Sequence, residues 1–270
     1  MDLDLTELAN HVRDSKSFHF PFETTWALPK VFGFQLTKFM VLELIVAALM
    51  LLIFLTLARR IRGGGPPKGL FWNFFEVMLV FIRDEVARPS IGKHDADKFL
   101  PFLWNMFFFI LFCNLLGILP WAGSATGALT VTAALAAITL CAVVGTGMYK
   151  FGVGGFFKSI VPHMELPKAV AILLIPMIFV IELAGLLIRH VVLAVRLLAN
   201  MFAGHLVLAV LLGFIAAAAN GVLFAWLGIT TVSVLGSAAL TLLELFVAFL
   251  QAYIFTFLSA LFIGMAVHPH

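Results

Sequence analysis

The chain has 270 residues, of which 63% are hydrophobic and 11% are charged. Soluble globular domains carry roughly 25% charged residues, so this composition excludes a soluble enzyme and indicates a polytopic membrane protein. The net charge of +3 comes from basic residues gathered in a few loops, which is how membrane proteins are oriented. It therefore gives no reason to expect a nucleic-acid partner.

The first half of the chain predicts an all-α fold with two kinds of helix. Residues 1–36 are polar and are expected to form an N-terminal extramembrane arm, whereas residues 37–270 form a transmembrane domain. Residues 37–60 are the first span, since about 20 apolar residues cross a ~30 Å hydrocarbon core. Residues 68–93 interleave charges with aromatic residues, so we expect an amphipathic helix at the membrane interface.

The second half of the chain predicts two helical hairpins. Residues 99–149 hold two apolar stretches joined by an uncharged link. Two longer apolar tracts follow, 166–219 and 222–267, with an Asn-Gly turn at 220–221. At ~1.5 Å per residue each tract is about twice as long as the hydrocarbon core is thick. Each therefore contains either two spans or one long, tilted helix, and the fold has about five crossings in the second case.

The distribution of basic residues predicts the orientation. The segment after the first span has eight lysines and arginines and the segment after the third span has three, while the link 121–127 has none. Basic loops stay in the cytoplasm, so both basic segments are expected there. With five crossings the N-terminus is outside and the C-terminus is cytoplasmic.

Polar residues are rare in the last hundred residues. Beyond residue 170 the chain carries four formal charges, Glu182, Arg189, Arg196 and Glu244. An ionised side chain at bilayer depth costs ~2.5–3.5 kcal/mol, so such charges are functional candidates. On a helix, Glu182, Arg189 and Arg196 fall with Asn200 within about 40° of one another, which makes one polar stripe.

Arg196 has no carboxylate within reach on its own helix. Glu182 is ~21 Å away along the axis, far beyond salt-bridge distance, although it can serve Arg189 through water. Arg189 itself either extends to the interface or belongs to a channel. Because an arginine cannot release its proton, Arg196 is a fixed positive charge that holds a nearby carboxylate ionised and blocks direct passage of a cation. We expect a partner to supply that carboxylate.

Suppose that the two tracts form an antiparallel hairpin in which Gln251 lies at the same depth as Arg196. A second pair of polar residues then shares a common depth, which we call the second polar level. His205 and Glu244 then lie ~13 Å and ~10 Å nearer the turn, at one height. An imidazole and a carboxylate at one height can exchange a proton. His205 is about 180° round from Arg196 on an ideal helix, so the two occupy different faces or the helix bends near Gly204.

Three motifs resemble signatures of subunit a of F-type ATP synthases. RLLANMFAGH at 196–205 is similar to RLxxNMxAG, LQAYIF at 250–255 to LQAxIF, and CNLLGILP at 113–120 to N-L-x-x-x-x-P. The resemblance extends over nearly the whole chain. It implies a proton-translocating stator subunit whose last two helices are long and tilted, with two offset aqueous half-channels leading to the carboxylates of a c-subunit ring.

The resemblance also assigns roles to residues. It implies that Arg196 faces the ring carboxylate, that Asn200 and Gln251 line the proton path, and that Glu182 belongs to its cytoplasmic half. Many family members have glutamate at the position of His205 and histidine at that of Glu244. Here the two are exchanged, so we expect an outer half-channel with an altered pH response. Asn114 and Arg189 have no settled role.

The implied partners are the c ring, the b subunits of the peripheral stalk, protons and the lipid bilayer, in a bacterial inner membrane. We expect no cofactor, no metal and no ATP chemistry in this chain, and residues 152–155, GVGG, are predicted to be a loop that does not bind phosphate. The alternatives are a sodium-translocating homologue, a self-contained ion-coupled transporter and a passive scaffold. A transporter of that kind usually contains internal repeats, and none is visible here.

Overall fold

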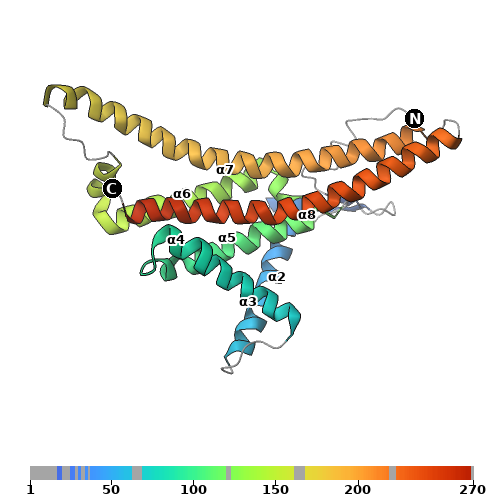
Figure 1. The fold of residues 1–270 in the computed structure, drawn as a ribbon, viewed down its shortest axis with the longest axis horizontal. Helices are drawn as coiled ribbons and strands as arrows, with labels where there is room; N and C mark the ends of the chain where they lie inside the picture. Colours follow the sequence, from blue (N-terminus) through green and yellow to red (C-terminus); the bar gives the residue numbers. More distant parts are fainter. Residues whose placement is uncertain are drawn as a thin grey trace. The chain divides into compact units, whose positions relative to one another are not determined.

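The computed structural model describes residues 17–19, 25–27, 30–31, 34–35, 37–62, 69–119, 123–160, 168–218 and 223–268. From residue 37 onward the described part of the chain is helical apart from short connections (Figure 1). The helices are α2 (Lys38–Ile61), α3 (Leu70–Phe81), the π-helical η1 (Ile82–Ala87), α4 (Arg88–Ile91), α5 (Ala96–Gly117), the 3-10 turn η2 (Ala125–Gly127), α6 (Leu129–Ser159), α7 (Lys168–Ala218) and α8 (Leu223–Val267).

Five of the described helices are long and apolar enough to cross a membrane, namely α2, α5, α6, α7 and α8. The predicted all-α polytopic fold with five crossings is therefore confirmed. α7 has 51 residues and α8 has 45, and each is one helix. At 1.5 Å per residue they are about 76 Å and 68 Å long, more than twice a ~30 Å hydrocarbon core. Both helices must therefore tilt strongly to stay within the membrane.

The segment predicted to lie at the interface is helical from Leu70 to Ile91, through α3, η1 and α4. Its position at the membrane surface stays a prediction. The π-helical turn in its middle was not anticipated. It comes where apolar residues give way to the charged sequence IRDEVA, and it leaves Ile82 and Val86 fully buried.

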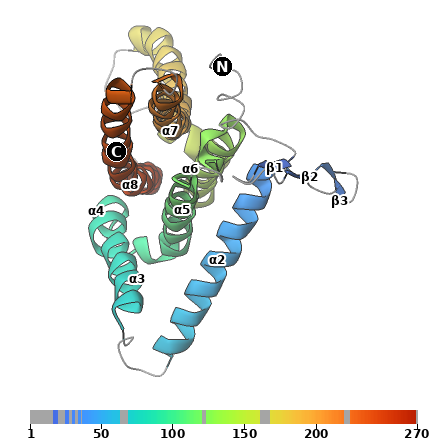
Figure 2. The ribbon, with the colours of Figure 1, turned by 90° about the vertical axis from the view of Figure 1, so that its right-hand side faces the viewer.

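The N-terminal arm contains two small antiparallel hairpins, β1 (Ser17–His19) with β2 (Thr25–Ala27) and β3 (Lys30–Val31) with β4 (Phe34–Gln35) (Figure 2). Strands were not predicted there. In the first hairpin Phe18 is paired with Trp26 in the strand register.

One local prediction was wrong. The glycine-rich residues 152–155 are not a loop, because α6 runs on to Ser159 with a kink at Gly152. Gly152 has φ 72° and ψ 166°, a conformation essentially restricted to glycine, which lets the chain change direction and resume a helix. The turn predicted at 220–221 lies outside the described residues.

The chain forms two compact units, each assembled from three separate stretches. Unit 1 consists of Met1–Thr56, Phe108–Thr132 and Arg196–Ala252, and unit 2 of Leu57–Phe107, Ala133–Val195 and Tyr253–His270. Unit 1 thus holds the later part of α7 and the earlier part of α8, which lie side by side (Figure 1). Unit 2 holds the interfacial helix and the start of α5.

Candidate functional site

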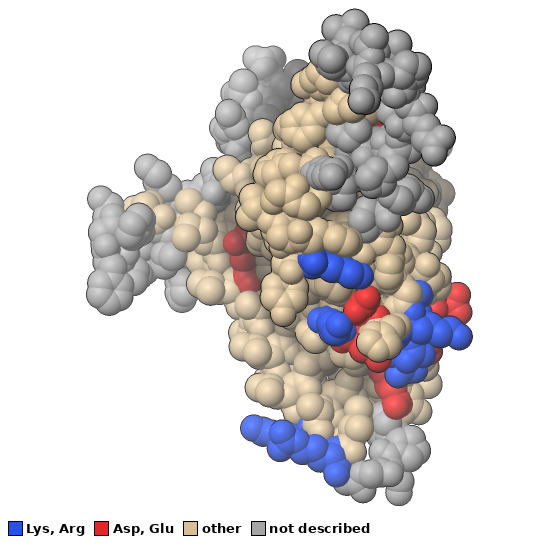
Figure 3. Space-filling view, turned by 90° about the vertical axis from the view of Figure 1, so that its left-hand side faces the viewer, with Lys and Arg blue, Asp and Glu red and all other residues tan. Residues whose placement is uncertain are grey.

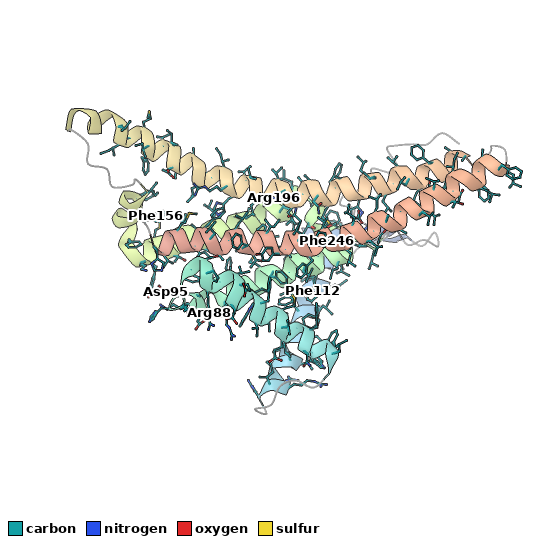
Figure 4. All side chains as sticks on the ribbon, in the orientation of Figure 1. Arg88, Asp95, Phe112, Phe156, Arg196 and Phe246 are labelled. Carbon is teal, nitrogen blue, oxygen red and sulfur yellow. The ribbon has the colours of Figure 1, made fainter. Side chains whose placement is uncertain are left out.

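Arg196 lies in unit 1 on α7, where its side chain is half-buried (Figure 4). Six ion pairs join residues between Arg83 and Lys150, and Arg196 takes part in none of them. α7 therefore carries a permanent positive charge that the described carboxylates do not neutralise.

The surface of α7 next to Arg196 is apolar and uncovered. Ala203, Val207, Val210 and Phe214 follow Arg196 at spacings of seven, four, three and four residues, and all four are exposed. These spacings place them on the same side of the helix as Arg196. Only 11% of the most apolar window of the α7 span is buried within the chain. This face is thus open to lipid or to a partner, with the charge at one end.

Gln251 connects α8 to α7 at the level of Arg196. Its side chain is buried, and its Nε2 donates a hydrogen bond of 3.0 Å to the backbone carbonyl oxygen of Arg196. The structure therefore has the register that was assumed for the hairpin. Asn200, one turn after Arg196, is half-buried on α7.

The second polar level also lies in unit 1. Glu244 extends its carboxylate onto Gly204, so that a β-carbon built on Gly204 would overlap its Oε1. Gly204 immediately precedes His205, which is half-buried. α7 is helical through this point, so His205 and Arg196 occupy different faces of a helix that continues through Gly204. Glycine leaves the carboxylate the space that a β-carbon would otherwise take.

Asn114 is the centre of a buried hydrogen-bond network that joins three elements of unit 1. It is fully buried, and its Nδ2 donates to the carbonyl oxygen of Ala248 on α8 at 3.4 Å. Its Oδ1 accepts from the hydroxyl of Thr126 at 2.7 Å, and Ser124 lies 2.7 Å from that hydroxyl. Since Thr126 gives its hydrogen to Asn114, Ser124 is the donor to Thr126. This network holds α5, η2 and α8 together.

Lys38 is a charged residue that sequence reasoning missed. It begins α2, yet it is buried, and its Nζ lies 3.2 Å from the place where a β-carbon on Gly123 would be. Gly123 has φ 68°, so the close approach and the backbone conformation both require glycine. A lysine at the start of a span usually extends to the interface, so its burial could not be predicted from the residues around it.

In unit 2, the earlier part of α7 carries Glu182, which is half-buried, and Arg189, which is exposed. The two are not joined by an ion pair in the described structure. His190, next to Arg189, is buried at 4% exposure and was not among the predicted site residues.

Acidic and basic side chains gather on one face of unit 2 (Figure 3). Asp84 accepts hydrogen bonds from Arg83 at 3.0 Å and from Arg88 at 2.7 Å, while Asp95 accepts one from Lys98 at 2.8 Å. The hydrogen bond from Arg83 lowers the pKa of Asp84, and the one from Lys98 lowers the pKa of Asp95. These pairs are at least partly exposed, so they contribute little to stability.

Comparison with known proteins places the chain among subunits of one membrane complex. Residues 40–264 match the family described as ATP synthase A chain. ATP synthase subunit a of Chloroherpeton thalassium is 40% identical over 274 residues, which cover 98% of this chain and 78% of that protein. The proteins of the same name from Myxococcus xanthus and Chlorobium phaeobacteroides are 39% and 37% identical and are matched over 75% and 74% of their lengths. The family match contains every candidate residue from Asn114 to Gln251.

Proposed function

The chain belongs to the ATP synthase subunit a family, and we propose that it is the stator subunit that conducts protons to and from a ring of c subunits. The observation that carries this proposal is the pairing of a fixed charge with an uncovered face. Arg196 is half-buried, has no ion-pair partner among the described carboxylates, and stands at the end of an exposed apolar stripe. A rotor surface with one carboxylate per subunit would cover that stripe and neutralise the charge.

The fixed charge separates the site of proton release from the site of proton uptake. A carboxylate that comes to face Arg196 is held ionised, because the guanidinium attracts it and cannot lose its own proton. The carboxylate must therefore release its proton on one side of Arg196 and take up another on the other side. Protons cannot bypass this exchange, since a cation moving straight past Arg196 would be repelled.

The polar residues fall into two groups on either side of Arg196. His205 and Glu244 form the outer half-channel. The Glu244 carboxylate lies against Gly204, the residue immediately before His205. Glu182 belongs to the cytoplasmic half, with Arg189 at its exposed edge. Gln251 holds α8 at the level of the charge, and Asn200 lines the path beside it.

Asn114 has a different role in this account. Hydrogen bonds to Ala248 and Thr126 occupy both ends of its side-chain amide, so it fixes the position of α8 and does not carry protons. The subunit would work in a bacterial inner membrane beside the b subunits, with its C-terminus in the cytoplasm, and ATP would be handled by other subunits.

The test is ATP-driven proton pumping by the assembled complex in inverted membrane vesicles. Arg196→Ala is expected to abolish pumping while the subunit still assembles, because the carboxylate would no longer be held ionised at the barrier. Arg59→Ala is the matched control, since it removes an exposed arginine at the end of α2 to which no part of the proton path is assigned. Normal pumping by Arg196→Ala would reject the proposed function. Measuring ATP-driven sodium uptake by the same vesicles separates the two ions.

A further inference from the structure

His190 is a buried imidazole with only one of its two nitrogens in use. It is 4% exposed and belongs to the part of α7 in unit 2. Its Nδ1 lies 2.8 Å from the carbonyl oxygen of Leu186, one turn earlier. Its ring centroid is 5.2 Å from that of Phe262 on α8. The imidazole therefore faces the second long helix and not the open side of α7.

The hydrogen bond to Leu186 determines the state of the ring. A carbonyl oxygen only accepts, so Nδ1 carries the hydrogen and the neutral ring presents a lone pair at Nε2. That Nε2 is buried and has no hydrogen-bond partner in the described protein structure. Buried polar atoms almost always have a partner, and where the protein provides none an internal water commonly does. Nε2 thus has a lone pair that can accept a hydrogen bond from a water.

The position of His190 along α7 shows on which side of Arg196 this imidazole lies. His190 precedes Arg196 by six residues, or ~9 Å, whereas His205 follows Arg196 by nine residues, or ~13 Å. Two imidazoles on one helix therefore stand on opposite sides of the fixed charge. His205 is on the side of Glu244, and His190 is on the side of Glu182.

We propose that His190 is a proton-transferring residue of the cytoplasmic half-channel, acting through a water bound at Nε2; this rests on the proposed function. In the transfer, the water at Nε2 receives an excess proton from the path and passes a proton on to Nε2, so that the water stays neutral and the ring becomes an imidazolium. The proton then passes from Nε2 to the next water, and the neutral ring with its hydrogen on Nδ1 is restored. No proton is gained or lost overall.

The surroundings of His190 contain few other groups that could take this role. On α7, its charged neighbour is Arg189, which acts on the ring electrostatically and has no proton to give. On α8, the residue in contact with the ring is Phe262. The titratable residue in the part of α8 within the membrane in unit 2 is Tyr253, and its ring packs against Phe81 and Phe257. Among the described residues, His190 is thus the titratable group at this point between the two helices.

The experiment is ATP synthesis by the whole complex in proteoliposomes, with the pH of each face set independently. His190→Gln keeps a donor for the Leu186 carbonyl and an acceptor for water, but it does not titrate. We expect His190→Gln to lower the rate by one to two orders of magnitude, at or below the lower end of the ~10²–10⁴-fold that proton-transfer groups supply, because water partly substitutes. The loss should depend on the pH of the cytoplasmic face and be unchanged by the pH of the outer face.

Two variants make the result specific. His205→Gln is expected to show the opposite sidedness, and His94→Gln, at a histidine whose side chain is 97% exposed, should behave as the wild type at every pH. Rates are normalised to the amount of assembled subunit, and His190→Phe tests whether packing against Phe262 is sufficient for assembly.

The proposal for His190 is overturned if His190→Gln matches the wild type at every pH, or if its defect follows the pH of the outer face. Neither outcome touches the proposed function, which depends on Arg196. Conversely, normal pumping by Arg196→Ala would remove the basis for both.

Discussion

Gly204 offers a test of the outer half-channel that leaves every polar residue in place. Substituting Gly204→Ala adds one β-carbon at the point where the Glu244 carboxylate lies. The carboxylate is the end of a flexible side chain, so it can rotate away at a cost of about 0.5–1.5 kcal/mol for a strained side-chain torsion. Alanine also favours a helix over glycine by about 1 kcal/mol, so the two effects nearly cancel and the subunit should assemble normally.

The expected functional effect is much larger than the effect on stability. The carboxylate oxygen must move by about 1 Å, and a displacement of that size in a reacting group can reduce a rate roughly 100-fold. We therefore expect Gly204→Ala to lower ATP-driven proton pumping by between ~10-fold and ~100-fold at unchanged subunit content.

A matched control is available on the same helix. Gly185 is also in α7, and a β-carbon there would meet nothing within 4 Å. Gly185→Ala should therefore assemble and pump as the wild type, measured in the same vesicles by the quenching of a pH-sensitive dye. Equal pumping by Gly204→Ala and Gly185→Ala would refute the reasoning, because the position of Glu244 would then be irrelevant to transport.

Three further predictions concern stability. Asn114→Ala should cost about 1–3 kcal/mol because it leaves the buried Thr126 hydroxyl without its acceptor, measured as a lower melting temperature of the detergent-purified subunit. Gly152→Ala should cost about 1–3 kcal/mol through backbone strain alone, since no atom lies within 4 Å of the added carbon. Asp95→Asn should abolish a stabilisation that is present above the ordinary carboxyl pKa of 3.8 and lost as the pH falls below it, because Lys98 lowers the pKa of the folded state.

Each of these has an outcome that contradicts it. An Asn114→Ala variant that melts with the wild type would mean that Thr126 finds another acceptor. An unchanged Gly152→Ala variant would mean that α6 can straighten. A wild type and an Asp95→Asn variant with parallel stability curves between pH 3 and 6, roughly the range in which carboxylates titrate, would show that Asp95 makes no linked contribution.

The sequence predicted the transmembrane helices well because a membrane span is set by length and apolarity, and both are local properties. It could not decide between one long helix and two spans in each final tract, since apolar residues are compatible with both. The resemblance to subunit a favoured one long helix, and α7 and α8 show it. The loop prediction at 152–155 failed because glycine composition does not reveal that a single residue, Gly152, carries the whole bend.

The candidate site was predictable where it depended on helical spacing. The depths of Gln251 and Glu244 relative to α7 were predicted from one assumed register of the hairpin. The hydrogen bond from Gln251 to Arg196 and the contact of Glu244 with Gly204 support that register. The residues that were missed depend on tertiary packing. Lys38 and His190 are buried by elements distant in sequence, so nothing near them along the chain distinguishes them from ordinary residues at the start or middle of a span.

The most direct measurement is a cryo-EM structure of the assembled membrane sector at a resolution that shows side chains. The account predicts that the carboxylate nearest to the Arg196 guanidinium belongs to a subunit of the ring, and that the exposed stripe of α7 is covered by that ring. A structure in which Arg196 forms an ion pair with Glu182 or Glu244 of its own chain, or faces away from the ring, would contradict it.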